Sequence, residues 1–294
     1  MTSRFGASAA LTTPFRPDGA IDFELMVAHA RSCLQRGCRS VTLFGTTGEG
    51  CSVGEAERDQ GLSAMLEAGI AGSQLVVGVL VDAAADAAAQ ARHALERGVR
   101  NVLLAPPSYF KGVSDDGVFR WFADVFAAIG PSARDILIYN IPSVTQVKIN
   151  LPVVDRLRAA FPAIAVGVKD SGGDWIYSEA LLQAHARHMV ILIGDERHLA
   201  QGVRLGGQGA ISGMANYATE AVVAMCETGT DDARVVSFVE ALLNHPVTPA
   251  VKATLAQLTA DERWLAVRAP LDVTPPDVRA ALAARFAELF GAAP

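Results

Sequence analysis

Eight short apolar segments alternate with longer amphipathic segments along most of this 294-residue chain. Several of the short segments are continuously apolar, as expected for strands of a parallel sheet that is covered on both faces. The longer segments place apolar residues three and four positions apart, and several stop at a glycine, which is typical of amphipathic helices. The pattern predicts strands at residues 5–11, 40–44, 74–80, 100–105, 135–140, 163–169, 190–194 and 209–213.

Eight strands that alternate with helices are typical of a (β/α)8 barrel, and a chain of this length can form such a barrel as one domain. The competing architecture, a doubly wound sheet, usually has a glycine-rich dinucleotide turn after its first strand, which FGASAALTTPF at 5–15 does not offer. Strand patterns cease after about residue 217, and only helical patterns follow. We therefore expect an α/β fold, a (β/α)8 TIM barrel over 1–225 that carries the active site, with a C-terminal helical region over 226–294.

Composition argues against several classes of partner. The formal net charge is −6 and basic residues do not cluster, whereas a nucleic-acid-binding protein needs a basic face. No apolar run approaches membrane-spanning length, and the N-terminal MTSRFGASAALTTPF lacks the basic region and long apolar core of a secretory signal. The four cysteines form no CxxC pair, so we expect reduced thiols in a cytoplasmic protein that binds neither nucleic acid nor membrane.

The sixth predicted strand ends in a lysine. In AIAVGVKDSGG, residues 163–173, six small or branched apolar residues lead directly to Lys169. Desolvation favours the neutral amine, which is the form that attacks a carbonyl to make a Schiff base. The alternative is a structural lysine that is ion-paired with Asp170 or another acid. The chain has only three other lysines, which lie in a loop (Lys111), in a polar stretch (Lys148) and in a late helix (Lys252).

Other polar residues follow the predicted strands, where the active sites of such barrels lie. Thr46 and Thr47 stand between glycines in GTTGEG, and they either bind an anion or belong to an ordinary tight turn. We expect Ser52 and Glu55 to form a capping box at the start of the next helix. Tyr109 follows the fourth strand and Tyr139 lies at the end of the fifth, although a single tyrosine at such a position more often anchors a loop through its hydroxyl.

A metal site is not expected. Asp195, Glu196 and His198 lie close together after the seventh strand, but a metal-dependent aldolase needs several histidines that converge at strand ends. The remaining histidines fall in predicted helices or in a linker: His29, His93, His185, His188 and His245. The sequence also has no P-loop and no G-x-S-x-G nucleophile elbow.

Taken together, these motifs resemble one family. GTTGE, the Pro-Tyr loop, YNIP, VKD, GDE and GGxGxIS occur in the order and spacing of the dihydrodipicolinate synthase and N-acetylneuraminate lyase superfamily, and so does the TPF-x-x-D-G-x-I-D opening at 13–22. The resemblance extends from the first strand into the C-terminal helices. It implies a class I aldolase-type barrel that assembles as a homotetramer, a dimer of dimers.

The resemblance also implies roles for individual residues. Lys169 forms an imine with pyruvate or another 2-oxo acid, so that no separate cofactor is needed, and Tyr139 transfers the proton. Thr46 and Thr47 hold the carboxylate of the keto acid. Three further matches follow: Tyr109 reaches the active site of the neighbouring protomer, and Gly194 and Ile211 lie around the bound keto acid.

The residue that follows the YNIPS motif differs from the one found in the synthases of this superfamily. There an arginine follows YN-x-P-S and binds the carboxylate of aspartate semialdehyde, whereas this chain has Val144, which cannot make that bidentate contact. We expect a pyruvate-dependent lyase or synthase that joins or cleaves a 2-oxo acid and an aldehyde. Two alternatives use the same imine, a lyase like N-acetylneuraminate lyase and a dehydratase or deaminase of a sugar-acid or hydroxyproline-derived 2-oxo acid. A non-catalytic paralogue is disfavoured, because Lys169, Tyr139 and Tyr109 are intact.

Overall fold

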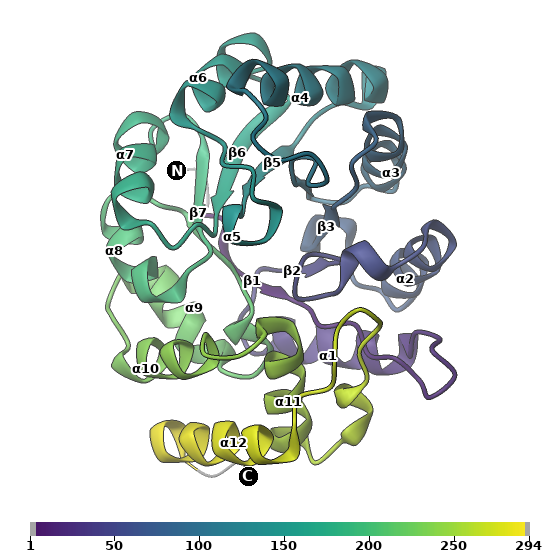
Figure 1. Cartoon of the computed structure of the whole chain (residues 1–294), viewed down its shortest axis with the longest axis vertical. Coiled ribbons are helices and arrows are strands. Elements are labelled where there is room, and N and C mark those ends of the chain that lie inside the picture. Colours follow the sequence, from purple (N-terminus) through teal and green to yellow (C-terminus); the bar gives the residue numbers. More distant parts are fainter. Residues whose placement is uncertain (1–3, 292–294) are drawn as a thin grey trace.

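The computed structural model describes residues 4–291, and its centre is a closed barrel of eight parallel strands in sequential order (Figure 1). The barrel closes where β1 pairs with β8, with Ser8 opposite Ile211. Each strand lies within two residues of its predicted position, which confirms the (β/α)8 prediction. The strands are β1 (Gly6–Ala10), β2 (Ser40–Leu43), β3 (Leu75–Val79), β4 (Asn101–Leu104), β5 (Ile136–Asn140), β6 (Ala165–Asp170), β7 (Val190–Ile193) and β8 (Gly209–Ser212).

Helices surround the barrel and connect successive strands (Figure 1). The α-helices are α1 (Phe23–Gln35), α2 (Glu55–Glu67), α3 (Ala84–Glu96), α4 (Asp115–Ile129), α5 (Pro142–Thr145), α6 (Leu151–Ala160), α7 (Trp175–His185), α8 (Leu199–Arg204), α9 (Thr219–Thr228), α10 (Ala233–Leu242), α11 (Val247–Thr259) and α12 (Pro276–Phe290). Short 3-10 turns occur at η1 (Gly50–Ser52), η2 (Gly72–Gln74), η3 (Gly130–Ser132), η4 (Glu196–His198), η5 (Met214–Asn216) and η6 (Glu262–Leu265).

The strands bury side chains on both faces, which explains their continuous apolar runs. One core lies between the strands and the surrounding helices and includes Val102, Ile138 and Val168. A second, smaller core fills the barrel interior with side chains from successive strands, among them Val76 and Leu137. Full burial of one such side chain stabilises the fold by about 1.5–3 kcal/mol. The interior is therefore packed, and the room for chemistry lies at the carboxyl ends of the strands.

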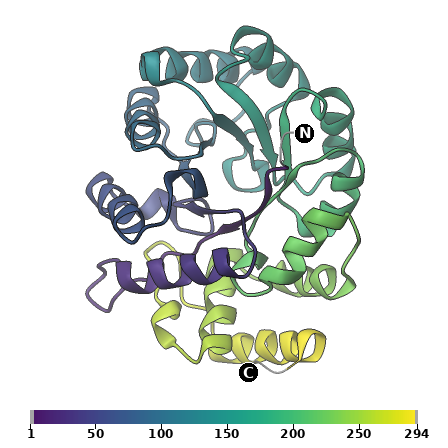
Figure 2. The same ribbon diagram turned by 180° about the vertical axis from the view of Figure 1, so that it is seen from behind.

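The C-terminal helices pack beside the barrel near its first helix. Aromatic contacts hold α10 and α12 against the barrel, since Tyr217 meets Phe238 and Phe286 edge to face, with centroids 5.9 and 5.6 Å apart. On α1, the His29 ring packs against Trp264 at 4.9 Å, and Figure 2 shows α1 beside this C-terminal region. Within residues 4–291, no helix is both long enough and apolar enough to cross a bilayer.

Candidate active site

Lys169 and Tyr139 lie side by side at the ends of neighbouring strands. They are register partners in the β5–β6 pair, and the Lys169 Nζ donates a hydrogen bond of 3.2 Å to the Tyr139 hydroxyl. The same nitrogen lies 4.3 Å from the centre of the tyrosine ring. Only 6% of Lys169 is exposed to solvent. Because register partners on parallel strands point to the same face, the hydrogen-bonded sheet itself brings the amine and the phenol together.

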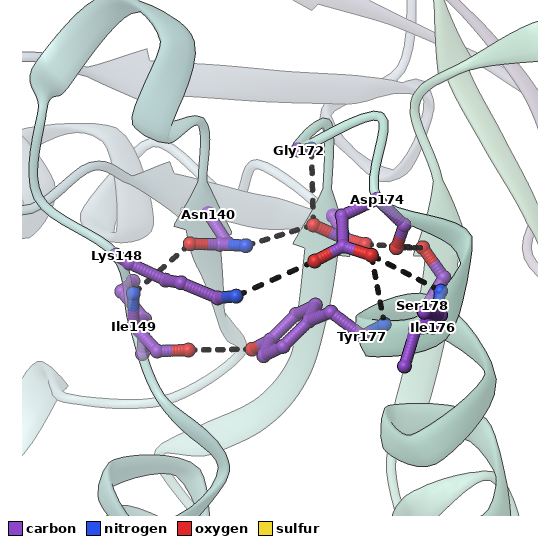
Figure 3. A network of polar contacts seen from close by, with 9 residues as sticks. Asn140, Lys148, Ile149, Gly172, Asp174, Ile176, Tyr177 and Ser178 are labelled. Carbon is purple, nitrogen blue, oxygen red and sulfur yellow. Dashed lines mark hydrogen bonds and ion pairs between the residues drawn. The ribbon is translucent and has the colours of Figure 1, made fainter.

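The next residues on the two strands point to the opposite face. Asn140 donates a hydrogen bond of 2.8 Å to Asp170, and Gly172 N–H and the Ser178 hydroxyl donate to the same carboxylate at 3.1 and 2.6 Å. Figure 3 shows Asn140 also accepting from the Ile149 N–H, at 3.0 Å. Burial raises the pKa of Asp170, and these hydrogen bonds partly offset that effect. The alternative in which Asp170 pairs with Lys169 is therefore wrong.

The other three lysines have different surroundings. Lys148 is about half exposed and lies 3.5 Å from the Asp174 carboxylate, and Lys111 donates to the Thr145 carbonyl at 3.2 Å near the surface. Lys252 is completely buried in α11, outside the cavity around Lys169, and it pairs with Glu49 at 2.6 Å. The sequence placed Lys252 on a helix but carried no sign of this burial.

The GTTGEG turn follows β2 and brings Thr46 to the same group of side chains. The Thr46 hydroxyl lies 3.3 Å from the Tyr139 hydroxyl, so the phenol is in contact with both a hydroxyl and an amine. The predicted capping box at Ser52 and Glu55 is wrong. The N-cap of α2 is Gly54, whose N–H donates to Glu57 at 3.0 Å, because the 3-10 turn η1 occupies residues 50–52.

A cavity of about 300 Å³ opens around these groups at the carboxyl ends of the strands. Seven of the eight predicted site residues line it: Thr46, Thr47, Tyr139, Val144, Lys169, Gly194 and Ile211. Steric crowding explains the glycine at position 194. A Cβ there would lie 2.0 Å from the Ser171 Oγ and 3.0 Å from the Lys169 Cε. A side chain there would force the Ser171 hydroxyl to move and would crowd the Lys169 side chain.

The eighth residue, Tyr109, lies outside this cavity. It is 77% exposed and packs edge to face against Phe110, which is itself 72% exposed. Val144 lies at the rim of the cavity and is 57% exposed. Tyr109, Phe110 and Val144 are thus large apolar side chains that are presented to solvent.

Sequence reasoning missed a buried carboxylate in this cavity. Glu196, on η4, accepts a hydrogen bond of 2.6 Å from the Ser212 hydroxyl and one of 3.5 Å from the Met214 N–H. Burial raises the pKa of Glu196 above its ordinary value. Its neighbour Asp195 binds Arg197 through two contacts, of 2.6 and 3.0 Å. The position just after β7 was a usable signal, since strand-end residues face the site.

The acidic cluster after β7 does not converge on a point. Asp195 binds Arg197, Glu196 binds Ser212, and the His198 ring packs against Trp175 with centroids 5.4 Å apart. Within residues 4–291 there is no group of three or more His, Cys, Asp or Glu side chains arranged to hold a metal ion. The polar groups that line the cavity at the strand ends are an amine, a phenol, hydroxyls, the Glu196 carboxylic group and the Asp195–Arg197 pair.

Known proteins share this architecture. A solved structure of dihydrodipicolinate synthase from Agrobacterium tumefaciens strain C58 is 58% identical, with a TM-score of 0.96 that covers 98% of this chain and 100% of that one. A DapA-like lyase from Chloroflexus aurantiacus is 32% identical over 97% of each chain. YagE from E. coli K12, a prophage protein of the dihydrodipicolinic acid synthase family solved in complex with pyruvate, is 20% identical. Its TM-score of 0.86 covers 97% of this chain and 98% of that one, and shows a shared fold.

The family assignment rests on the whole chain. The model of the dihydrodipicolinate synthetase family matches residues 4–285, which include every strand and all but the end of the last helix. This range also contains the lysine, tyrosine and threonine side chains that meet at the strand ends. The chain belongs to the dihydrodipicolinate synthetase family and is one of its lyases.

Proposed function

We propose that Lys169 forms a Schiff base with pyruvate or a closely related 2-oxo acid, and that the imine drives carbon–carbon bond formation or cleavage. The observation that carries this proposal is the buried Lys169 amine, 3.2 Å from the Tyr139 hydroxyl in an open cavity. An amine next to a proton-transfer group is what imine formation requires. The pyruvate complex of YagE supports the same choice of keto acid.

The contacts around Lys169 support the following steps. The Lys169 lone pair adds to the keto carbon. The carbonyl oxygen takes up two protons, one lost by the attacking nitrogen and one delivered through Tyr139, and leaves as water, which leaves a protonated imine. The protonated imine then withdraws electrons, so that the neighbouring carbon loses a proton and becomes a nucleophile toward an aldehyde, or the reverse bond breaks. Tyr139 carries the protons at these steps, because its hydroxyl touches both the amine and Thr46.

The threonine turn is assigned to the carboxylate of the keto acid. Thr46 and Thr47 both line the cavity, and their hydroxyl and backbone groups are suitable donors to an anion. Gly194 and Ile211 form the wall near the lysine, where a flat, small keto acid fits. The covalent imine makes a separate cofactor unnecessary.

The second substrate is assigned from the rim of the cavity. Val144 replaces the arginine of the synthases, so we propose that aspartate semialdehyde is not the preferred aldehyde. Val144→Arg is expected to improve the use of aspartate semialdehyde, measured as kcat/KM in the condensation assay. Efficient turnover of that aldehyde by the unmodified protein would show this proposal to be wrong.

A hydroxylated substrate is the second candidate, and one observation favours it. Glu196 is buried in the cavity wall with one oxygen bound to Ser212, and the Asp195–Arg197 pair lies beside it. Such a wall suits the hydroxyl groups of a sugar-acid 2-oxo acid, cleaved by aldolysis or dehydrated through the same imine. The intact Lys169–Tyr139 contact argues against a non-catalytic paralogue.

We also propose a cytoplasmic homotetramer built as a dimer of dimers. The exposed Tyr109–Phe110 pair supports it, because burial in a partner protomer would cover both rings and bring Tyr109 to the neighbouring site. The four free thiols suit a reducing compartment. Sedimentation velocity tests the assembly: a strict monomer at micromolar concentration contradicts it.

Borohydride trapping tests the imine. The protein is incubated with pyruvate or with other 2-oxo acids, including sugar acids, then reduced, digested and examined by mass spectrometry. We expect one adduct on Lys169, and none in Lys169→Ala. Lys252, which is also buried but lies outside the cavity, serves as the internal control. An unmodified Lys169 with every keto acid would overturn the proposal.

A further inference from the structure

A second buried lysine lies just outside the cavity. Lys252, on α11, has no exposed surface, and its ammonium group has three kinds of neighbour. It donates to the Glu49 carboxylate at 2.6 Å and to the Thr13 carbonyl at 2.9 Å, and it lies 4.5 Å from the centre of the Phe15 ring. The proposed imine chemistry makes no use of this group.

Glu49 belongs to the same turn as the two threonines. It adopts the left-handed conformation, with φ of 53°, which residues other than glycine rarely adopt. Both carboxylate oxygens have partners, since one accepts from Lys252 and the other accepts from the Arg268 backbone N–H at 2.9 Å. Contacts from the C-terminal region therefore hold this unusual backbone conformation in place.

Further contacts link the ion pair to Thr46. The Glu49 N–H donates to the Thr46 carbonyl at 3.1 Å, and the Thr248 hydroxyl, on α11, donates to the same carbonyl at 3.2 Å. Thr13, whose carbonyl binds Lys252, donates from its own hydroxyl to the Gly48 carbonyl at 2.6 Å. The turn that presents Thr46 to Tyr139 is thus anchored on two sides through Lys252.

Stability alone is a poor explanation for this arrangement. Burying two opposite charges costs desolvation that their attraction often fails to offset, and an apolar pair of similar volume is frequently as stable. Desolvation accordingly lowers the pKa of Lys252, against the effect of Glu49. An ion pair, unlike an apolar contact, sets the direction and distance of the groups that it joins.

We propose that Lys252 and Glu49 are positioning residues, which fix the Thr46–Thr47 turn so that its hydroxyls face the carboxylate of the 2-oxo acid. The inference rests on the proposed function and adds the C-terminal helix α11 to it. Neither side chain touches the substrate. Their loss is expected to weaken binding of the keto acid more than it slows later steps.

The test uses three variants of the full chain, Lys252→Met, Glu49→Gln and the double variant. The double variant removes both charges while it keeps volume, so it stays folded even where Lys252→Met alone leaves a buried carboxylate unpaired. The readout is the pyruvate concentration that gives half-maximal borohydride adduct at Lys169, measured beside the midpoint of thermal unfolding. We expect the half-saturating concentration to rise at least tenfold in all three variants, while kcat changes less.

Leu95→Ala is the matched control, because Leu95 is fully buried in α3, far along the chain from the turn. It should lower the unfolding midpoint and leave the half-saturating pyruvate concentration unchanged. If the double variant regains both the thermal unfolding midpoint and the half-saturating pyruvate concentration of the unmodified protein, the pair serves stability alone and the inference is overturned. So would an unchanged half-saturation in Glu49→Gln. The absence of any adduct in the unmodified protein would instead contradict the proposed function.

Discussion

The side-chain amide of Asn140 donates a hydrogen bond of 2.8 Å to the Asp170 carboxylate, directly behind the contact between Tyr139 and Lys169. Side chains alternate between the faces of a strand, so each residue of the outer pair follows one residue of the inner pair. The outer pair therefore fixes the spacing of the two strand ends, and through it the spacing of the amine and the phenol.

Asp170→Ala is expected to destabilise the fold by about 1–3 kcal/mol, because it leaves the donors of Asn140 and Ser178 without a buried acceptor. Asp170→Asn keeps an oxygen toward Asn140 and should retain most of the stability. Urea denaturation measures both. Asp174→Ala, at a more exposed carboxylate, is the control and should change stability less. Equal losses in Asp170→Ala and Asp174→Ala would contradict the structural role of Asp170.

Tyr139→Phe is expected to reduce kcat by roughly 10²- to 10⁴-fold, the usual contribution of a positioned proton-transfer group. The fold should be nearly unaffected, because within residues 4–291 the hydrogen-bond partners of this hydroxyl are the cavity groups Thr46 and Lys169. Tyr177→Phe is the matched control: its hydroxyl donates to the Ile149 carbonyl outside the cavity, so stability should fall while kcat is kept. A Tyr139→Phe protein with normal turnover would remove Tyr139 from the mechanism.

Gly194→Ala is expected to slow adduct formation at Lys169 by up to about 10-fold, because the new Cβ crowds the Lys169 Cε and a full 1 Å displacement at a reacting group costs on the order of 10²-fold. The new Cβ would lie 3.0 Å from the Lys169 Cε and closer still to Ser171. The rate of borohydride-trapped adduct formation is the measurement. Gly117→Ala in α4 is the control. Its new Cβ would lie 3.5 Å from the nearest atom, the Ser114 Oγ, so the rate of adduct formation should not change. Equal rates in the two variants would refute the steric argument.

Glu196→Gln is expected to flatten the dependence of stability on pH. Burial raises the pKa of Glu196 above its ordinary 4.5, so the folded protein holds this proton more tightly than the unfolded chain does. The free energy of unfolding should therefore fall as pH rises from about 4.5 through the raised folded-state value, and the variant should lack this decline. Urea titrations across that range measure it, with the exposed Glu67→Gln as control. Parallel curves for the unmodified and Glu196→Gln proteins would contradict the prediction.

The sequence was sufficient to predict the barrel and most of the cavity, for a physical reason. Parallel strands between helices are continuously apolar, so their ends are easy to locate, and the residues that follow them must meet at one end of the barrel. Lys169 and Tyr139 were found in this way, although they lie 30 residues apart in the chain. Gly194 was noted as a strand-end glycine that lets substrate approach closely, whereas Ile211 came only from the family resemblance.

What the sequence did not predict depends on contacts between distant segments. Lys252 reads as an ordinary helix lysine, because its partner Glu49 lies 203 residues earlier and the helix pattern does not show what covers it. Glu196 was considered only as a metal ligand, since its hydrogen bond to Ser212 joins two separate strand ends. Asp170 was offered as a partner for Lys169, although strand alternation sends the two side chains to opposite faces.

The location of the reacting groups has a consequence for how this protein can change over evolution. Lys169 and Tyr139 lie on hydrogen-bonded strands, whereas much of the cavity rim, including Val144 and Leu243, lies on helices and loops. A substitution at the rim can exchange one aldehyde or sugar acid for another without shifting the register of β5 and β6. New substrates can therefore be acquired by point mutation, while an insertion or deletion within either strand would separate the amine from the phenol and end the chemistry.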